Sequence, residues 1–338
     1  MKHFKKFIIA AAVVLGATSN ATAQVDPHFS QYYVYPSWLN PGMTGAIDAD
    51  YRVSAIYRNQ WAGITNAFST VGLSADFVTD KNLNFGVSLL NQTAGDGGYT
   101  YTTAYGNIAY TGLRLGVAGT HRIVFGVQGG LINRRFNPSK FTFGDQWNPA
   151  TGFPPSNPTS TEVFARTSAA TFDAGAGVAY YDATPGKKAN MFLGFSASHL
   201  TQPEDPFIST GTPQKLPMRL TFHGGVRLLV SETFSITPNL LYLRQGNAEE
   251  KMVGAYGQIR ANEQTDFMFG ANYRFNDAFS PYIGFSYKSF VLGASYDVNT
   301  SDLGRAAGGG ANSFEISLSF FGRKNKTLPA EPFVCPRL

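Results

Sequence analysis

The sequence predicts an all-β protein, a transmembrane antiparallel β-barrel of about 14 strands whose N- and C-termini are periplasmic. Three observations support this fold class. Apolar and small polar residues alternate with period two in many segments, the non-apolar positions are mostly Gly, Ser, Thr and Asn, and only 14% of the residues are charged. Such alternation means that the two faces of a strand meet different surroundings, which in a membrane barrel are lipid and a polar lumen.

The segment SFVLGASYDVN at 289–299 illustrates the alternation. Every second residue from Phe290 to Val298 is apolar, with small or polar residues between them and Val291 as the one exception. A water-soluble sheet alternates in the same way, because its apolar face meets a core. Its outer face would carry more large charged side chains than these segments do, so a hydrated, confined lumen fits better.

Strand-like runs recur between turn signals along the whole chain. About fourteen are found, at residues 51–58, 68–78, 82–92, 101–111, 121–135, 168–182, 189–199, 218–230, 233–244, 252–261, 265–275, 279–287, 289–298 and 312–322. An even number of strands is typical of bacterial single-chain outer-membrane barrels. The runs therefore define one barrel domain over residues 51–322.

The lengths of the connections predict how the barrel is oriented. Short links follow even-numbered strands, at 78–81, 183–188, 230–233 and 261–264. Long links follow odd-numbered strands, at 136–167, 200–217 and 299–311. Outer-membrane barrels have short periplasmic turns and longer surface loops. Both termini are therefore expected in the periplasm, although the short link after the eleventh strand does not fit the pattern.

Two further segments flank the barrel domain. Residues 1–23 have the pattern of a cleaved signal peptide, with three lysines, an apolar run at 7–16 and a final Ala-Thr-Ala. That run is too short for a membrane anchor. Residues 24–50 are expected to form an N-terminal periplasmic or plugging segment. Residues 323–338 are expected to form a C-terminal periplasmic tail that is disordered, docks a partner or re-enters the barrel.

Composition and motifs give no support for a nucleic-acid, metal or catalytic site. The net charge of +5 is modest and no long basic block is present. No metal and no cofactor is expected, because metal-ligand spacing is lacking among His28, His121, His199 and His223. No GxSxG motif is present. Ser198 and His199 are neighbours in a predicted strand and are expected on opposite faces, which favours a loop-anchoring role for His199 over catalysis.

Three basic side chains share one face of the run at 218–230. Arg219, His223 and Arg227 follow at steps of four residues and span about 26 Å, at about 3.3 Å per residue. They are a candidate lumen-facing cationic row for an acidic plug, a passing polypeptide or small anions. The simpler interpretation, which we prefer, is pairing with acidic residues of other strands, namely Glu315, Asp297 or Asp266.

The segment YRNQWAG at 57–63 forms a dense polar and aromatic cluster where the first strand ends. In one interpretation it folds inward and helps to close the pore. In the other, Trp61 is an interfacial residue with solvated neighbours. The sequence does not decide between the two.

Several motifs together resemble the PorP/SprF family of the type IX secretion system. They are the opening DPHFSQYYVYPSWLNPGMTG, then YRNQW, SxHLxQP, SYDVNxSxL, FEIS and the ending CPR. The family motif positions are Asp26, Pro27, Phe29, Ser30, Gln31, Asn40, Pro41, Tyr57, Arg58, Asn59, Gln60, Trp61, His199, Gln202, Pro203, Tyr296, Asp297, Asn299, Glu315, Cys335, Pro336 and Arg337. One departure lies at residues 42–44, where the family often has Ala and an aromatic residue.

The resemblance implies a non-enzymatic barrel in the outer membrane that supports export or surface attachment of a large adhesin of the gliding type with a C-terminal sorting domain. The implied partners are outer-membrane lipid, the adhesin or its sorting domain, other type IX secretion components and a periplasmic lipoprotein that links to peptidoglycan. Nucleic acid is not among them. A passive diffusion porin is the main alternative, and a lipid-hydrolysing barrel that uses Ser198 or His199 is a further one.

Overall fold

The computed structural model describes residues 26–63, 68–79, 81–95, 98–116, 119–153, 160–161, 166–204, 215–307 and 311–323. The expected signal peptide, the tail from residue 324 with Cys335, Pro336 and Arg337, and parts of the long links lie outside these residues.

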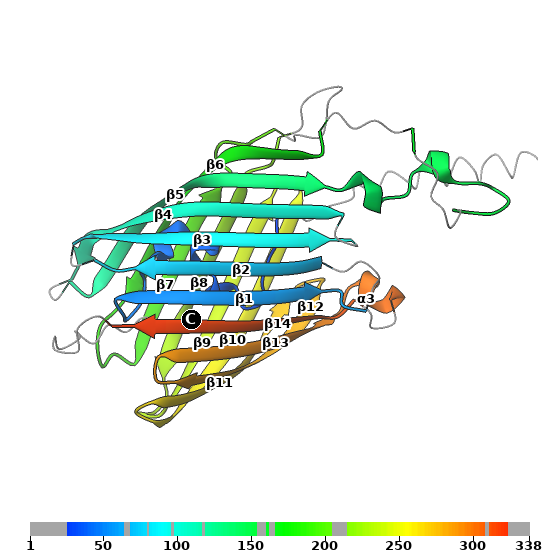
Figure 1. Ribbon diagram of the computed structural model, residues 1–338. Coiled ribbons are helices and arrows are strands. Elements are labelled where there is room, and N and C mark those ends of the chain that lie inside the picture. Colours follow the sequence, from blue (N-terminus) through cyan, green and yellow to red (C-terminus); the bar gives the residue numbers. More distant parts are fainter. Residues whose placement is uncertain are drawn as a thin grey trace, which may run out of the picture.

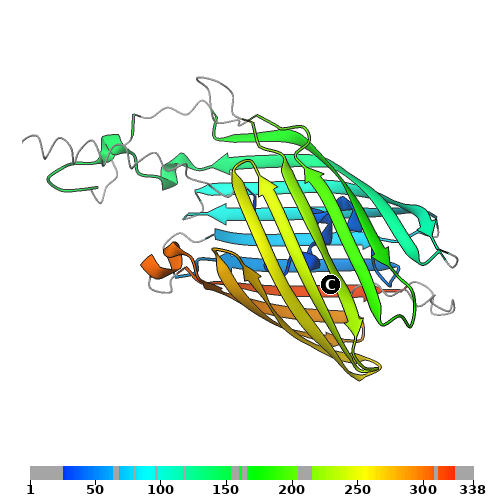
Figure 2. The same ribbon diagram turned by 180° about the vertical axis from the view of Figure 1, so that it is seen from behind.

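The described residues form a ring of antiparallel strands (Figures 1 and 2). The strands are β1 (Tyr51–Gln60), β2 (Phe68–Phe77), β3 (Leu83–Ala94), β4 (Tyr99–Leu115), β5 (His121–Phe136), β6 (Ser168–Asp182), β7 (Ala189–Ser198), β8 (Arg219–Leu229), β9 (Phe234–Gln245), β10 (Ala248–Asn262), β11 (Thr265–Arg274), β12 (Ala278–Tyr287), β13 (Phe290–Asn299) and β14 (Ser313–Gly322). The predicted bounds differ most at β4 and β10, which are longer than expected.

The ring closes between the first and the last strand. Each strand pairs with its neighbours in the chain, and β14 pairs with β1, where Arg58 lies opposite Glu315. A closed ring has no free strand edge, so the backbone N–H and C=O groups are satisfied within a bilayer. The predicted transmembrane antiparallel β-barrel is confirmed.

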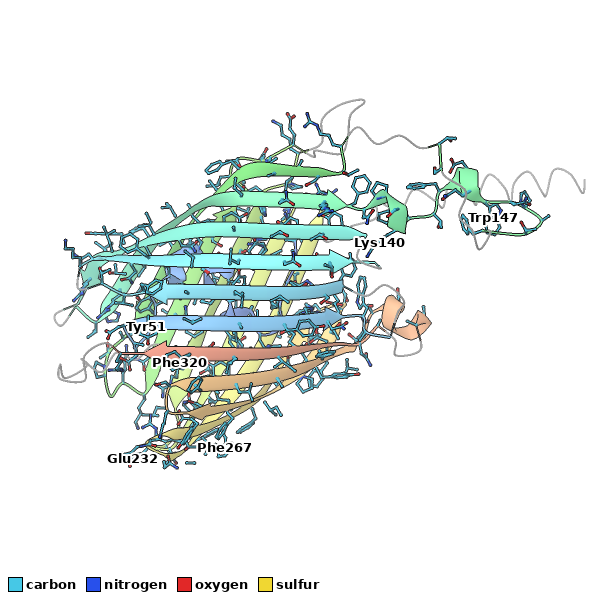
Figure 3. The ribbon with its side chains drawn as sticks, viewed as in Figure 1. Tyr51, Lys140, Trp147, Glu232, Phe267 and Phe320 are labelled. Carbon is cyan, nitrogen blue, oxygen red and sulfur yellow. The ribbon has the colours of Figure 1, made fainter. Side chains whose placement is uncertain are left out.

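The two faces of the strands differ as the alternation predicts. Phe267, Leu292 and Tyr296 point away from the lumen and are each nearly half exposed, and Figure 3 shows Phe267 on the outside of the ring. Ser295 and Asp297, between the apolar residues of β13, are buried inside. Among the described residues no helix is long and apolar enough to cross a membrane.

The two ends of the barrel carry different connections. One end, called the loop end here, has the long links after β5, β7 and β13, with η3 (Pro138–Lys140), η4 (Gly144–Gln146) and α3 (Asp302–Ala306). The other, called the hairpin end, has the short links after even-numbered strands and the end of β14. Figure 3 shows Lys140 and Trp147 beyond the loop end and Glu232 at the hairpin end. The short links after β9 and β11 also lie at the loop end.

The segment before β1 fills part of the lumen. Residues 26–47, called the plug here, contain η1 (Tyr32–Val34), α2 (Pro36–Leu39) and η2 (Pro41–Met43), and all of their side chains are buried. Figures 1 and 2 show this dark blue segment inside the ring. Pro36 and Pro41 begin their turns, where the fixed φ of proline suits the first helical position.

The plug runs along the barrel from one end to the other. Its first described residue, Asp26, contacts His199 and Arg219 at the loop end. The chain then reaches Asp48, whose backbone carbonyl accepts a hydrogen bond from Arg323 at the hairpin end. Asp26 and Arg323 therefore lie toward opposite ends. The predicted location of both termini in the periplasm stays a prediction.

Glycines in the wall let the plug approach closely. A Cβ added to Gly126 of β5 would lie 2.2 Å from the backbone carbonyl of Pro41, far inside van der Waals contact. A Cβ on Gly177 of β6 would lie 2.1 Å from Oδ1 of Asn40. The start of η2 in the plug is therefore seated on backbone that carries no side chain.

We expect Gly126→Ala to lower the free energy of unfolding by about 1–3 kcal/mol, because the added methyl group overpacks the contact with Pro41. Urea titration of the folded, heat-modifiable band on an SDS gel measures the change. Gly106→Ala in β4 is the matched control, because its nearest atom lies 3.9 Å away. Equal destabilisation by both substitutions would contradict the close seating of the plug.

Candidate functional site

The candidate functional site is the set of contacts that hold the plug in the lumen. Two clusters of buried charges lie near the loop end, and a hydrogen-bonded turn lies farther toward the hairpin end. Within the described residues, no group of His, Cys, Asp or Glu side chains is arranged to hold a metal ion. The chemistry of the site is therefore described in terms of ion pairs and hydrogen bonds.

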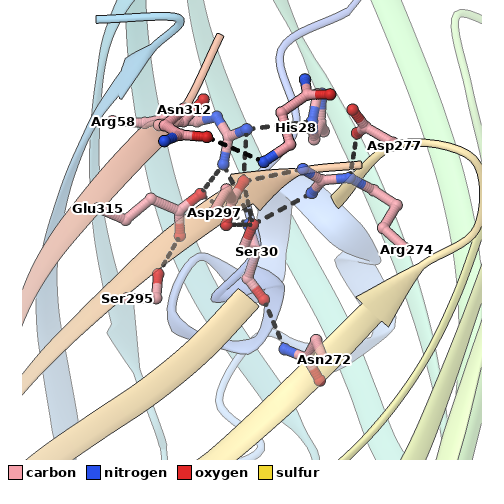
Figure 4. Close-up of polar contacts among 12 residues, drawn as sticks. His28, Ser30, Arg58, Asn272, Arg274, Asp277, Ser295, Asp297, Asn312 and Glu315 are labelled. Atoms are coloured by element: carbon pink, nitrogen blue, oxygen red, sulfur yellow. Dashed lines mark hydrogen bonds and ion pairs between the residues drawn. The ribbon is translucent and has the colours of Figure 1, made fainter. Parts of the chain in front are cut away.

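The first cluster, called the Arg58–Arg274 cluster, joins the plug to four strands (Figure 4). Its members are His28, Ser30, Arg58, Arg274, Asp297 and Glu315. Asp297 lies 2.9 Å from the Arg58 guanidinium and 2.8 Å from that of Arg274. Arg58 also pairs with Glu315. Arg274 also pairs with Asp277, which is only partly buried. Each buried cation of the cluster thus meets two carboxylates.

The plug enters this cluster through Ser30 and the next residue. The backbone N–H of Ser30 donates to Glu315 at 2.7 Å, and that of Gln31 donates to the other oxygen at 2.9 Å. The Ser30 hydroxyl donates to Asp297 at 2.7 Å, and Asn272 of β11 donates to the Ser30 carbonyl at 3.0 Å. The carboxylates of β13 and β14 therefore bind both the wall arginines and the plug, Asp297 through the Ser30 hydroxyl and Glu315 through two backbone N–H groups.

The second cluster, called the Asp26–His199 cluster, contains Asp26, Asp173, His199 and Arg219. One ring nitrogen of His199 lies 2.7 Å from the Asp26 carboxylate and the other 2.8 Å from that of Asp173. Arg219 donates to Asp26 at 2.9 Å. Its guanidinium also lies 4.4 Å from the centre of the Trp38 ring, a cation–π geometry.

His199 carries a positive charge in this cluster. Burial opposes its protonation, but the carboxylates of Asp26 and Asp173 outweigh burial and raise the pKa of His199 to about 9. Burial likewise opposes ionisation of Asp26, but His199 and Arg219 outweigh it and hold the pKa of Asp26 below its usual value. Both members of the pair are therefore ionised near neutral pH.

The backbone at His199 explains why one sequence prediction is wrong. Ser198 and His199 both face inward: Ser198 accepts a hydrogen bond from Arg219, and His199 contacts the plug. His199 lies beyond the last residue of β7 and has a φ of 58°. This left-handed conformation is uncommon for residues other than glycine, and it turns the imidazole into the lumen. Carboxylates engage both of its ring nitrogens, so His199 is not placed to activate Ser198.

The third contact is a turn held by Asn40. The Asn40 side chain accepts a hydrogen bond from the backbone N–H of Gly42 at 2.8 Å and donates to the Val178 carbonyl at 3.0 Å. Its amide nitrogen also lies 3.2 Å from Nε2 of His223. Because the amide group is the donor, Nε2 of His223 is the acceptor and carries no proton.

The predicted cationic row does not act as one site. Arg219 binds Asp26 of the plug, and His223 binds Asn40. Arg227 is half-buried and lines a cavity of about 330 Å³ at the hairpin end. The preferred pairing is wrong for Arg219, because the predicted acidic partners meet other residues. Glu315 and Asp297 pair with Arg58 and Arg274, and Asp266 accepts a hydrogen bond from Gln258.

Many of the family motif positions in the described part of the chain fall into two groups. One group anchors the plug: Asp26, Ser30, Gln31, Asn40, Arg58, His199, Asp297 and Glu315. The second group shapes the loop end. Tyr57 packs on Phe314 at 5.9 Å, and Asn299 accepts a hydrogen bond from the backbone of Ser301. The Pro203 carbonyl accepts a hydrogen bond from Leu216.

The segment YRNQWAG contributes a single residue to the charged clusters. Arg58 points into the lumen, whereas Trp61 packs edge-on against Phe68 of β2 at 5.4 Å. Inward folding of the whole segment is not seen.

Three members of the clusters were not predicted as site residues from the sequence, namely His28 of the plug, Arg274 and Asp173. Arg274 and Asp173 each lie in a strand on the lumen face, among Gly, Ala and Asn. A lone charge on the predicted inner face of a strand is the signal that identifies such residues.

We expect the plug to loosen as the pH rises through about 9. His199 has a higher pKa in the folded protein than the usual 6.5, so its charge stabilises the fold fully below pH 6.5, and this contribution is lost as pH rises through the folded value. Urea unfolding from pH 6 to pH 10 measures the loss. His199→Gln lowers stability at pH 7 and flattens the curve. A wild-type curve without this decline would contradict the charged state of His199.

The chain was compared with known proteins. No curated protein matches the chain. Among solved structures, a Ralstonia pickettii toluene transporter, TbuX, is similar with 11% identity and a TM-score of 0.49, covering 84% of this chain and 92% of its own. The CymD monoaromatic hydrocarbon channel is similar with 10% identity and a TM-score of 0.47, covering 88% and 95%.

A family model described as type IX secretion system membrane protein PorP/SprF matches residues 21–320. That range includes the barrel up to Phe320 of β14, two residues before the end of that strand, and every described residue of both charged clusters. The chain therefore belongs to the PorP/SprF family and is an outer-membrane β-barrel associated with type IX secretion.

Proposed function

We propose that this protein is a plugged, non-conducting barrel that supports export or surface attachment of a large adhesin with a C-terminal sorting domain. The observation that carries the proposal is the anchored plug. Both charged clusters join the plug to the wall through buried ion pairs and hydrogen bonds near the loop end. A lumen held closed in this way suits a platform for other proteins better than a passive diffusion porin.

The proposed orientation places the loop end outside the cell and the hairpin end in the periplasm. The long links after β5, β7 and β13 then form the outer surface. The hairpin end, where the chain enters β1 and leaves β14, then faces other secretion components. A periplasmic lipoprotein linked to peptidoglycan is a suitable partner for that end.

The link after β5 supplies a candidate contact for the exported protein. Residues 137–153 extend well beyond the ring (Figures 1 and 3). Trp147 and Phe153 pack edge-on at 4.9 Å near the tip and are about half exposed. Exposed aromatic side chains are typical of the residues that dominate protein–protein binding. We therefore assign the adhesin contact to residues 137–153, called the arm here.

The same contacts support a non-enzymatic role. Both ring nitrogens of His199 are engaged with carboxylates, and the Ser198 hydroxyl accepts a hydrogen bond from Arg219. Nucleophilic catalysis needs a base that can take the proton of the hydroxyl group. The lipid-hydrolysing alternative therefore lacks support at its two candidate residues.

We expect the purified protein to show no steady conductance in planar bilayers. Deletion of residues 26–47 removes the plug and opens a steady current, provided that the variant still gives a folded, heat-modifiable band. The matched control removes residues 139–153 of the arm instead and stays closed. A steady current from the wild-type protein would favour the porin.

We expect Trp147→Ala with Phe153→Ala to reduce recovery of the surface adhesin with the barrel from outer membranes by about tenfold or more, as for loss of binding-site anchor residues. Quantitative mass spectrometry of the purified complex measures the recovery. Thr151→Ala on the same arm is the control and keeps it. Full recovery with the double substitution would place the contact elsewhere.

A further inference from the structure

A cavity of about 430 Å³ opens beside the plug at the hairpin end. It is called the vestibule here, and it lies between the plug and strands β10 to β14 and β1. Four tyrosines line it, Tyr33 from the plug, Tyr51 from β1, Tyr256 from β10 and Tyr282 from β12. The plug thus fills the lumen unevenly, and neither charged cluster contributes to the walls of the vestibule.

The vestibule has an aromatic wall and a hydroxyl-rich wall. The Tyr33 ring lies 5.9 Å from that of Tyr256 and 5.9 Å from that of Tyr282. The remaining lining includes Ser286, Ser317 and Ser319, together with Val291, the apolar exception in the alternation of β13. A site of this kind suits an extended peptide with apolar and hydrogen-bonding groups, because the rings offer flat apolar surface and the hydroxyls offer polar contacts.

The chain itself leaves the barrel at the rim of the vestibule. Phe321, Gly322 and Arg323, at the end of β14, are part of its lining. Residues 324–338 follow directly. Fully extended, these fifteen residues reach about 50 Å, whereas a ten-residue strand such as β14 is about 33 Å long. Every part of the vestibule is therefore within reach of the tail.

The sequence of the tail matches the lining. It reads KNKTLPAEPFVCPRL, with prolines at 329, 332 and 336 and an apolar pair at Phe333 and Val334. Proline-rich segments favour the polyproline II conformation and dock on aromatic-lined grooves at low entropic cost. Glu331 adds an acidic group, and the exposed cation Lys288 stands at the rim, where Arg323 pairs with Asp48.

We propose that residues 324–338 fold back into the vestibule and pack their proline-rich part against Tyr33, Tyr256 and Tyr282. The tail is favoured over a peptide from another protein because it is covalently attached at the rim. A short tether gives an effective concentration in the millimolar range, which a separate partner would have to match. This inference does not depend on the adhesin proposal.

The single cysteine of the chain, Cys335, provides a direct test. A disulfide forms only when the two Cα atoms come within about 7 Å. Ser286→Cys places a second thiol inside the vestibule, where Ser286 is buried. Ser231→Cys places one in the exposed link between β8 and β9, also at the hairpin end but outside the vestibule.

Under mild oxidation of the purified full-length protein, we expect Ser286→Cys to cross-link to Cys335 about tenfold faster than Ser231→Cys, as a difference in effective concentration. Peptide mapping after proteolysis identifies the bond. A tail that moves freely in solution gives the opposite order, because the thiol at 231 is the more exposed. Equal or faster cross-linking at 231 would overturn the proposal.

A second measurement does not need the cross-link. In the Cys335→Ser background, we expect a maleimide to label Ser286→Cys slowly in the full chain and faster after truncation at Arg323, with both proteins giving the folded band. An unchanged rate in the purified protein would overturn the proposal. Protection that appears only in native outer membranes would assign the vestibule to a partner peptide, and that result also counts against the tail.

Discussion

The pairing of buried charges across the boundary between plug and wall is the constraint on which this structure depends. Arg58, Arg219 and Arg274 are each nearly fully buried. Moving such a cation out of water costs several kcal/mol, and the cost is offset only by close carboxylates and further hydrogen bonds. For Arg219 that carboxylate belongs to Asp26 of the plug. The wall thus carries a buried positive charge on Arg219, and the plug supplies the carboxylate that pairs with it.

The two charged clusters offset the cost of burying arginine side chains in different ways. In the Arg58–Arg274 cluster the wall supplies both signs of charge, and the plug adds the backbone N–H groups of Ser30 and Gln31. In the Asp26–His199 cluster the plug supplies one of the two carboxylates. In the first cluster the wall itself therefore supplies the carboxylates for both arginines. The second cluster would keep two cations against one carboxylate without the plug.

Close packing of the plug against the barrel wall adds to the effect of the charge pairs. Wall glycines such as Gly126 and Gly177 admit the turn at Asn40 and Pro41 to distances that a side chain would prevent. The plug aromatics Tyr33 and Trp38 fill the space between these fixed points, and Trp38 lies between its neighbour Tyr35 and Tyr105 of β4. Polar contacts define the position of the plug in the lumen, and burial of its apolar side chains supplies much of the free energy that holds it there.

The strands could be predicted from the sequence because period-two alternation is a local pattern. The plug could not be placed, because it has no such period and its contacts join residues far apart in the chain, such as Ser30 and Glu315. Pairing partners of the lumen charges depend on which strand lies opposite and at what height, which is a property of the closed ring. The orientation of His199 depended on one backbone angle that the pattern does not report.

The position of the plug ahead of β1 has a consequence for the order of assembly. The segment is made first, yet it binds Glu315 in the strand that is made last. That same strand closes the ring on β1. The last strand to be synthesised therefore both completes the wall and supplies an anchor for the first segment, which couples the seating of the plug to the completion of the chain.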